Sequence, residues 1–382
     1  MSAPGTTPAS SEDPLGRPLR WGIIATGLVA SWFVTDLCLN RPDGRAGHVI
    51  QAVGSSSLEK SQNFVATHIT ANDTEGRHVG VKAYGSYADV YADPDVDIVY
   101  IATPHAMHRQ NCLDAIAAGK HILCEKAFTI NAREAREVFD AAKAKGVFVM
   151  EGVWTRFFPV TRTLQRLLHE EHVIGDVHRV FCDFAMKKPM ATLSPTDSSR
   201  LVNRSLGAGT LLDIGIYSLM WGLLTLDSGV GEAARTPQVL ASQNIVNGID
   251  WATSMILTYP APSDGTKPAQ QAILTSSSLI KTPASFCRIE GSSGYIVVDG
   301  FAASVPASFT VYDTTTPETK SQKYEFERPG KGFYWEADAI AHNIAAGKTE
   351  NELMPWAETL RVMNLLDEVR RQGGATFPQD EQ

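Results

Sequence analysis

The stretch Ala118-Gly119-Lys120-His121-Ile122-Leu123-Cys124-Glu125-Lys126 decides how the first half of the chain folds. It reads as a helix end, a glycine stop and a short apolar strand, followed by two opposite charges. In an open α/β sheet, ligands bind outside the carboxyl ends of the strands, and this is where Lys126 would lie. Such a lysine can hold a substrate oxygen or take part in proton transfer. Alternatively, Glu125 and Lys126 are only a polar strand end that meets water.

The composition is typical of a soluble globular protein, because 43% of the 382 residues are hydrophobic and 20% are charged. The length predicts two domains. A net charge of -8 argues against a nucleic-acid-binding surface. No apolar run approaches the roughly 20 residues that cross a bilayer, so no membrane contact is expected. Five scattered cysteines favour a reduced, cytoplasmic compartment, and their spacing predicts no metal site.

The residues before the stretch begin with a candidate cofactor loop. Arg20 to Ala25 is predicted to be a strand that runs into a small-residue turn and then a helix to about Leu39. Such a turn lets backbone N–H groups approach a pyrophosphate at the helix N-terminus. Ala25 and Ala30 occupy two of the three glycine positions of the fingerprint, so the motif alone is weak. The predicted cofactor contacts in this loop are Ala25, Thr26, Gly27, Leu28 and Val29.

The second predicted strand, residues 48–54, indicates which dinucleotide binds. It follows the first helix at the distance that a βαβ unit requires. An NAD-specific site would carry an acidic residue near the end of this strand. The chain has instead Ser55, Ser56 and Ser57, with Lys60 close behind, and these residues suit the 2′-phosphate of NADP. Ser57 can also be a helix cap beside a solvated Lys60, and both interpretations can hold.

Alternating strands and helices continue to residue 152 and predict a doubly wound Rossmann domain over residues 19–152, behind a flexible arm, 1–18. The strand at 97–102 ends in a turn that faces the same crevice as the glycine loop. Two histidines in this turn lack cysteine or carboxylate partners, so a metal site is not predicted. Contact with the cofactor, or plain helix capping, is expected of Thr103, Pro104, His105 and His108.

Residues 153–382 have a different pattern and are predicted to form a second domain. A helix over 160–170 is followed by alternating runs with one packed face and one free face, which predicts a meander. These runs are 177–185, 238–246, 252–259, 270–277, 286–290 and 308–312, with a hairpin loop or insertion at 261–268 and helices at 332–347 and 356–371.

Asp213 and Tyr217 form an i, i+4 pair, so on a helix their side chains share a face. The preceding Gly207-Ala208-Gly209 suits close approach of the backbone to a ligand. Alternatively, Asp213 only stabilises the helix, because its negative charge interacts favourably with the helix dipole, and Tyr217 is a core residue.

Three segments resemble the glucose-fructose oxidoreductase / inositol dehydrogenase (Gfo/Idh/MocA) family: Ile101–His105, Ala118–Lys126 and Glu151–Pro159. The third, with Met354–Glu358, resembles the branch of dimeric dihydrodiol dehydrogenases and NADP-dependent D-xylose 1-dehydrogenases. The resemblance runs from about Arg20 to Gly374. It implies an N-terminal Rossmann domain, a C-terminal α+β domain with a large, mostly antiparallel open sheet, and a homodimer.

The resemblance also implies a catalytic set. Lys126 matches the lysine of the family's Glu-Lys-Pro motif, although Ala127 replaces the proline and relaxes the backbone there. Asp213 is kept, and Tyr217 stands where many members have a histidine, as is usual in this branch. Tyr217 is expected to be the general base, and Lys126 to hold the substrate oxygen and lower the pKa of Tyr217. Asp213 would position a second hydroxyl or orient Lys126.

Three further residues have an open role. Trp154 and Arg156 are predicted to contact cofactor and substrate, as a wall and a polar anchor, or to belong to a domain-crossover cluster. Glu125 is predicted either to touch the cofactor or to pair with Lys126.

The function predicted from these residues is NADP-dependent oxidation of a sugar hydroxyl, with D-xylose oxidised at C1 to the lactone. One alternative is a trans-1,2-dihydrobenzene-1,2-diol dehydrogenase, which would use the same residues on an apolar diol. Another is a non-catalytic NADP-sensing regulator, against which the presence of Lys126, Asp213 and Tyr217 argues.

Overall fold

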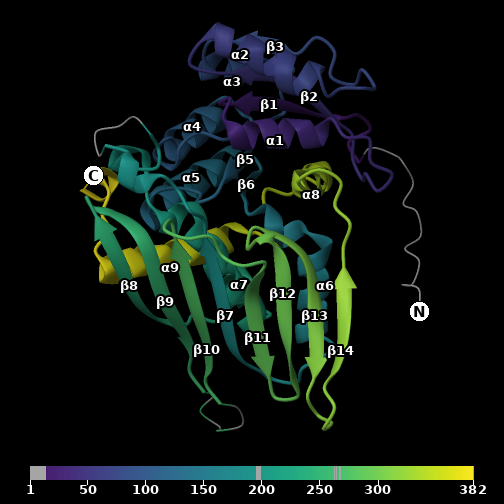
Figure 1. The fold of residues 1–382 in the computed structure, drawn as a ribbon. Coiled ribbons are helices and arrows are strands. Elements are labelled where there is room, and N and C mark those ends of the chain that lie inside the picture. The colour runs from purple at the N-terminus through teal and green to yellow at the C-terminus, as the bar shows by residue number, and fades with distance from the viewer. Residues whose placement is uncertain (1–13, 195–198, 262, 264, 266–267, 382) are drawn as a thin grey trace.

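The computed structural model describes residues 14–194, 199–261, 263, 265 and 268–381 (Figure 1). Residues 1–13 of the predicted arm, and parts of the predicted loop at 261–268, lie outside the described residues. The described end of the arm is attached to the fold, because the Arg17 guanidinium donates two hydrogen bonds to the Asp97 carboxylate at 2.6 and 2.9 Å.

The first sheet is parallel, with strand order β3-β2-β1-β4-β5-β6, which confirms the predicted Rossmann fold. The order reverses between β1 and β4, so a crevice opens there at the carboxyl ends of the strands. The strands are β1 (Leu19–Ile24), β2 (His48–Gly54), β3 (Lys82–Tyr84), β4 (Ile98–Ile101), β5 (His121–Glu125) and β6 (Val149–Gly152). The helices are α1 (Leu28–Leu37), α2 (Leu58–Phe64), α3 (Tyr87–Ala92), α4 (His105–Ala117) and α5 (Ala132–Lys145).

Local chemistry explains where these elements begin and end. The Asn131 side chain accepts a hydrogen bond from the Glu134 N–H at 3.0 Å and caps α5, whose other end is closed by Gly146 at φ 70°. Strand β4 is buried along its whole length, as expected of a parallel strand covered on both faces. Within this core the rings of Phe33 and Tyr100 stack at 3.9 Å.

The second sheet has eight strands in the order β14-β13-β12-β11-β7-β10-β9-β8 and is mostly antiparallel. The strands are β7 (Val177–Ala185), β8 (Gln238–Val246), β9 (Ile249–Tyr259), β10 (Gln270–Ser277), β11 (Ser285–Gly291), β12 (Gly294–Ala302), β13 (Val305–Asp313) and β14 (Lys320–Glu325). It is not the predicted plain meander, because β7 lies between β11 and β10 and pairs with β10 in parallel. The long crossover between β7 and β8 permits this parallel pairing.

Helices cover one face of this sheet. The chain leaves β6 through a 3-10 turn (Trp154–Phe157) and α6 (Pro159–His169), and later adds α7 (Ile216–Leu226) and α9 (Trp356–Gly373). Helices α6, α7 and α9 all contact strands of the second sheet. The segment Arg204–Leu226 has the length and composition of a membrane span, which the sequence analysis did not anticipate. Its most apolar window is 89% buried, as in the core helix of a globular fold.

Helix α8 (Phe333–Ala345) returns from the second sheet to pack against α1 (Figure 1). The buried Asp36 of α1 accepts hydrogen bonds from three successive backbone N–H groups, those of residues 331–333, at 2.7 to 2.9 Å. Asp338 of α8 pairs with Arg41 at 2.8 Å and with His48 at 3.0 Å. These contacts hold the start of α8, and with it Phe333, beside the first sheet.

A buried carboxyl fixes the segment that follows Lys126. Glu151, at the end of β6, accepts a hydrogen bond from the Phe128 N–H at 3.0 Å and is fully buried. Burial raises the pKa of Glu151 to about 7, from 4.5. Between these two pH values the folded chain therefore binds a proton at Glu151 that the unfolded chain has released.

This shift predicts a pH-dependent stability. A raised carboxyl pKa stabilises the fold at low pH, and this contribution is lost as the pH rises from about 4.5 to about 7. Glu151→Gln keeps an acceptor for Phe128 but does not titrate. We expect the unfolding free energy of the variant, relative to the native chain, to rise by about 3 kcal/mol across this range.

Guanidinium unfolding curves between about pH 4 and pH 8 measure this difference. Glu352→Gln, at a carboxyl that is 77% exposed, controls for the loss of one negative charge. A Glu151→Gln difference that stays constant with pH contradicts the prediction.

Candidate active site

A cavity of about 440 Å³ lies at the crevice between the two sheets and holds most of the predicted site residues. The Rossmann side supplies the loops after β1, β4 and β5, and the second half supplies the end of β7 and the start of α7. Of the residues predicted to contact cofactor or substrate, those that line it are Ala25, Gly27, Leu28, Val29, Thr103, Pro104, His105, Glu125, Lys126, Trp154, Asp213 and Tyr217.

The glycine loop leaves the N-terminus of α1 open. No side chain caps the helix at Gly27, and a side chain added at Gly27 would meet no atom within 4 Å. Leu28 is 66% exposed. Ala25 keeps the left-handed backbone of the glycine that it replaces, with φ 82°, at a cost on the order of 1 kcal/mol. The loop thus retains the shape and the free N–H groups that fit a dinucleotide pyrophosphate.

A second cavity next to this loop contains the predicted phosphate contacts. Ser55, Ser56 and Lys60 line it together with Thr26, whose hydroxyl lies 3.1 Å from that of Ser55. The Lys60 ammonium donates to the Ser56 hydroxyl at 3.1 Å. Ser57 instead accepts the Lys60 backbone N–H at 3.3 Å and caps α2, which is the alternative role considered for it. No acidic side chain lines this cavity in the described residues.

Lys126, Asp213 and Tyr217 converge in the main cavity. The Lys126 ammonium donates to the main-chain carbonyl of Asp213 at 2.7 Å and lies 3.6 Å from its carboxylate. It also lies 5.4 Å from the centre of the Tyr217 ring. The chain is π-helical over Leu211–Gly215 and becomes α-helical at Ile216, so the predicted i, i+4 pair spans the junction of the two. Both side chains nevertheless line the cavity.

Tyr217 is held by Trp154, whose indole N–H donates to the phenol oxygen at 2.7 Å. Burial raises the pKa of Tyr217 well above its usual value, the charge of Glu125 raises it further, and the bond from Trp154 lowers it. Lys126 is expected to lower the pKa of Tyr217, but in this structure burial outweighs the groups that lower it. The donor that favours a phenolate is Trp154.

Two cations that the sequence analysis missed hold the Asp213 carboxylate. Lys188 pairs with one carboxylate oxygen, and Arg200 lies 3.2 Å from the other. Burial acts to raise the pKa of Asp213, but Lys126, Lys188 and Arg200 outweigh it and keep the pKa well below its usual range. Lys188 and Arg200 lie in a polar segment after β7 that has no periodicity, so no pattern in the sequence assigns them to a site.

Glu125 faces the cavity but its partner is on β4. Its carboxylate accepts a hydrogen bond from the Tyr100 hydroxyl at 2.5 Å, and it is 7% exposed. Burial raises the pKa of Glu125, while Lys126 and the bond from Tyr100 lower it. The hydrogen bond thus identifies a Tyr100–Glu125 pair beneath Lys126 that the sequence did not indicate.

Two predicted contact residues point away from the cavity. Arg156 is 3% exposed and donates to the Glu358 carboxylate at 2.5 Å and to the Leu353 carbonyl at 3.0 Å, so the crossover-cluster alternative describes it. His108 is fully buried, and its ring nitrogens lie 2.8 Å and 3.1 Å from the carbonyl oxygens of Thr103 and Ala127. The structure therefore does not bring Arg156 and His108 to the cavity, and both side chains bind main-chain carbonyl oxygens instead.

The remaining wall of the cavity is apolar, which adds residues that the sequence analysis did not single out. The Trp154 ring stacks on Phe333 at 4.1 Å, and the Phe184 and Tyr217 rings lie 5.8 Å apart. Further apolar lining comes from Trp32, Met186, Leu206 and Ile214. In the described part of the chain, no three His, Cys, Asp or Glu side chains are arranged to hold a metal ion.

Comparison with known proteins agrees with this geometry. Residues 19–153 match the family described as "Oxidoreductase family, NAD-binding Rossmann fold". The chain is 38% identical to D-xylose 1-dehydrogenase (NADP(+)) of Hypocrea jecorina, over 95% of each chain. It is 30% identical to trans-1,2-dihydrobenzene-1,2-diol dehydrogenase of Sus scrofa, over 95% of this chain and 99% of the relative.

Solved structures share the fold over nearly the whole chain. An aldose-aldose oxidoreductase from Caulobacter crescentus superposes with TM-score 0.74 at 22% identity, over 94% of this chain and 98% of the other. A 3-ketoreductase from Actinomadura kijaniata, in complex with NADP and TDP-benzene, gives 0.73 at 21% identity with the same coverage. With the family match and the relative at 38% identity, the chain belongs to the Gfo/Idh/MocA family and is an NAD(P)-dependent oxidoreductase.

Proposed function

We propose that the protein oxidises an aldopyranose at C1 to the lactone with NADP, and that D-xylose is a substrate. The observation that carries the proposal is the convergence of Lys126, Asp213 and Tyr217 in a cavity that the glycine loop also lines. The relative at 38% identity, which is named as a D-xylose 1-dehydrogenase, supports the choice of sugar.

Each residue of this set has its own role in the proposed reaction. NADP, when bound, supplies the acceptor for the hydride of C1. Tyr217 takes the proton of the C1 hydroxyl as general base, and the Lys126 ammonium donates a hydrogen bond to the same oxygen. The Asp213 carbonyl directs the ammonium, since it accepts one of its N–H bonds at 2.7 Å. Tyr217 is 5% exposed, and its phenol oxygen accepts a hydrogen bond from the Trp154 indole N–H at 2.7 Å.

The cavity beside the glycine loop favours NADP over NAD in this proposal. A 2′-phosphate would meet the hydroxyls of Ser55 and Ser56 and the Lys60 ammonium, all of which donate. No acidic side chain among the described lining residues would repel it.

A trans-dihydrodiol is the second candidate substrate. The apolar side chains of Phe184, Met186 and Ile214 would suit an unsaturated carbon ring, and the reacting hydroxyl would use the same Tyr217 and Lys126. Relatives about 30% identical to this chain are named as dehydrogenases of this diol.

We propose that the protein is a homodimer joined through the uncovered face of the second sheet. Strand register places residues from seven strands in one row across that face: Leu240, Ile256, Ile273, Phe181, Arg288, Val297 and Thr310. Most of these side chains are apolar, and Leu240 is 67% exposed. The apolar part of the row is contiguous over Leu240, Ile256, Ile273 and Phe181, and Arg288 follows it. An exposed apolar patch of this kind is typical of an isologous interface.

The proposed compartment is the cytoplasm. All five cysteines are unpaired and buried, which agrees with a reducing environment.

Initial rates with D-xylose, D-glucose and benzene dihydrodiol, each with NADP and with NAD, test the proposed function. We expect D-xylose and NADP to give the highest kcat/KM. Lys60→Ala should raise the KM for NADP by about tenfold and leave the KM for NAD unchanged, because a charge-assisted bond to the 2′-phosphate is lost.

Lys143→Ala, on the exposed last turn of α5, is the matched control for the Lys60 variant. Equal saturation by NAD and NADP would reject the assignment of the phosphate site. Turnover of the diol alone would favour the second candidate.

Removing the proposed base tests the mechanism. Tyr217→Phe should lower kcat by roughly 10²-fold or more. Trp154→Phe removes the N–H that stabilises the phenolate, so the rise of kcat with pH should move to higher pH.

Tyr312→Phe, at a ring stacked on Tyr295 in the second sheet, is the matched control for Tyr217→Phe. An unchanged kcat in Tyr217→Phe would move the base role to Lys126.

The dimer is tested by sedimentation velocity. We expect the native chain to sediment with the mass of two chains, and Leu240→Glu to sediment as one, because the substitution places a charge in the apolar row. A native monomer at micromolar concentration would contradict the interface.

A further inference from the structure

The sugar end of the main cavity carries more positive than negative charge. Lys126, Lys188 and Arg200 line it as cations, whereas Asp213 and Glu125 are its acidic residues in the described part of the chain. The Glu125 carboxylate accepts a hydrogen bond from the Tyr100 hydroxyl at 2.5 Å. Asp213 pairs with all three cations, and Lys126 also acts on Glu125, because its charge lowers the pKa of that carboxyl.

Among the described residues, the Arg200 guanidinium has one hydrogen-bond partner, the Asp213 carboxylate. One of its terminal nitrogens donates to the Asp213 carboxylate at 3.2 Å, but the side chain is 51% exposed at the mouth of the cavity. A guanidinium has five N–H donors in a planar fork that fits a carboxylate in a bidentate way. Lys188 lies beside it on the same carboxylate and is 13% exposed.

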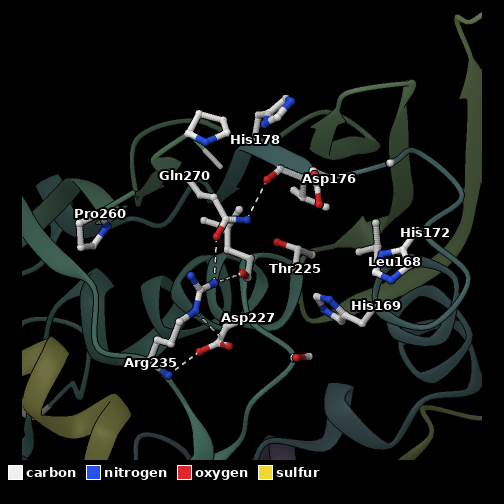
Figure 2. A pocket seen from close by; sticks show the side chains of 15 residues that line it. Leu168, His169, His172, Asp176, His178, Thr225, Asp227, Arg235, Pro260 and Gln270 are labelled. Carbon is white, nitrogen blue, oxygen red and sulfur yellow. Dashed lines mark hydrogen bonds and ion pairs between the residues drawn. The ribbon is translucent and has the colours of Figure 1, made fainter. Parts of the chain in front are cut away.

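An arginine elsewhere in the second half, Arg235, has its hydrogen-bond donors bound by other parts of the fold. Arg235 lines a smaller cavity of about 260 Å³ between α6 and the loop before β10 (Figure 2). Its guanidinium donates to the Leu226 carbonyl at 2.7 Å and to the Gln270 amide oxygen at 2.9 Å, and it also lies 3.5 Å from Asp227. The Tyr259 ring covers it at 4.5 Å. No aromatic ring covers Arg200 in the described residues, although the two side chains are similarly exposed, at 51% and 49%.

We propose that the cavity takes an aldopyranose that carries a carboxylate on C5, a hexuronate, with Arg200 and Lys188 as the carboxylate subsite. This inference rests on the proposed function, because the reacting carbon remains C1 at Lys126 and Tyr217. The hydride of C1 passes to NADP, the hydroxyl proton passes to Tyr217, and the carbon–oxygen bond becomes the lactone carbonyl. The carboxylate takes no part in the redox step and only binds.

Charge explains why a carboxylate fits better than a neutral group at C5. Among the described lining residues, the three cations Lys126, Lys188 and Arg200 outnumber the two carboxylates by one. Arg200 is 51% exposed and is screened by water, whereas Lys188 and Asp213 are 13% and 12% exposed and are screened less. A hydroxymethyl group supplies no charge to offset this excess. A substrate carboxylate would complete the pairing, and charge-assisted bonds of this type are about twice as strong as neutral ones.

A matched series of sugars isolates this interaction. D-Xylose, D-glucose and D-glucuronate share the configuration of C2, C3 and C4 and differ at C5, which carries hydrogen, hydroxymethyl or carboxylate. We expect kcat/KM with NADP to be on the order of tenfold higher for D-glucuronate than for D-xylose, mainly through a lower KM. Arg200→Gln should reduce this preference by about tenfold or more, and Lys188→Gln should reduce it as well.

Lys187→Gln is the matched control, since this exposed neighbour of Lys188 does not line the cavity. The preference for D-glucuronate should persist in it, and its loss there would overturn the subsite, because a general charge effect would then explain the data. The KM for NADP should stay unchanged in Arg200→Gln, since a rise would place the cofactor rather than the sugar at Arg200.

Binding without turnover separates this inference from the proposed function. Trp154 lines the cavity, so tryptophan fluorescence of the protein alone can be titrated with each sugar. D-Glucuronate should bind at lower concentration than D-xylose or D-glucose, and Arg200→Gln should remove the difference. Equal binding and equal turnover of all three sugars would overturn the carboxylate subsite while leaving C1 oxidation standing. Binding of D-glucuronate without oxidation of any sugar would support the subsite and reject the proposed reaction.

Discussion

The position of one ammonium group ties the two halves of the molecule together. Lys126 leaves the end of β5 and donates to the main-chain carbonyl of Asp213, 87 residues later, at 2.7 Å. The chain is π-helical over Leu211–Gly215 and becomes α-helical at Ile216, so this carbonyl lies just before the junction of the two. The hydrogen bond therefore aligns the Rossmann crevice with the start of α7, and Tyr217 comes within reach of the same ammonium as a result.

Much of the fold was predictable because burial leaves a pattern in a parallel sheet. Strands such as β4 read as continuous apolar runs, and a cap such as Asn131 marks the start of a helix. Strand β14 was missed because an edge strand with exposed polar side chains has no alternation to detect. Strand β12 alternates but contains Gly294 and Gly300, which weaken a strand pattern. The place of β7 next to β10 depends on long-range pairing that no local pattern encodes.

The site residues at strand ends were predictable from the sequence. The site residues whose position depends on partners distant in the sequence were not. Lys126 and the glycine loop follow directly from the order of the strands. Arg156 lies in a segment that resembles the family's site motif, yet Glu358, 202 residues further on, draws it into the core. Arg200 shows the reverse case, because an exposed arginine in an aperiodic segment is brought to Asp213 only by the fold.

The docking of α8 bears on how such chains can be recombined. Asp36 in the first half binds three backbone N–H groups at the start of α8, and Phe333 from α8 stacks on Trp154 at the cavity. A chimera that takes its first 152 residues from one relative and the rest from another would therefore cut through a single packing unit. An exchangeable cofactor module of this fold has to include α8 as a second, discontinuous segment, together with Asp338 and its partners Arg41 and His48.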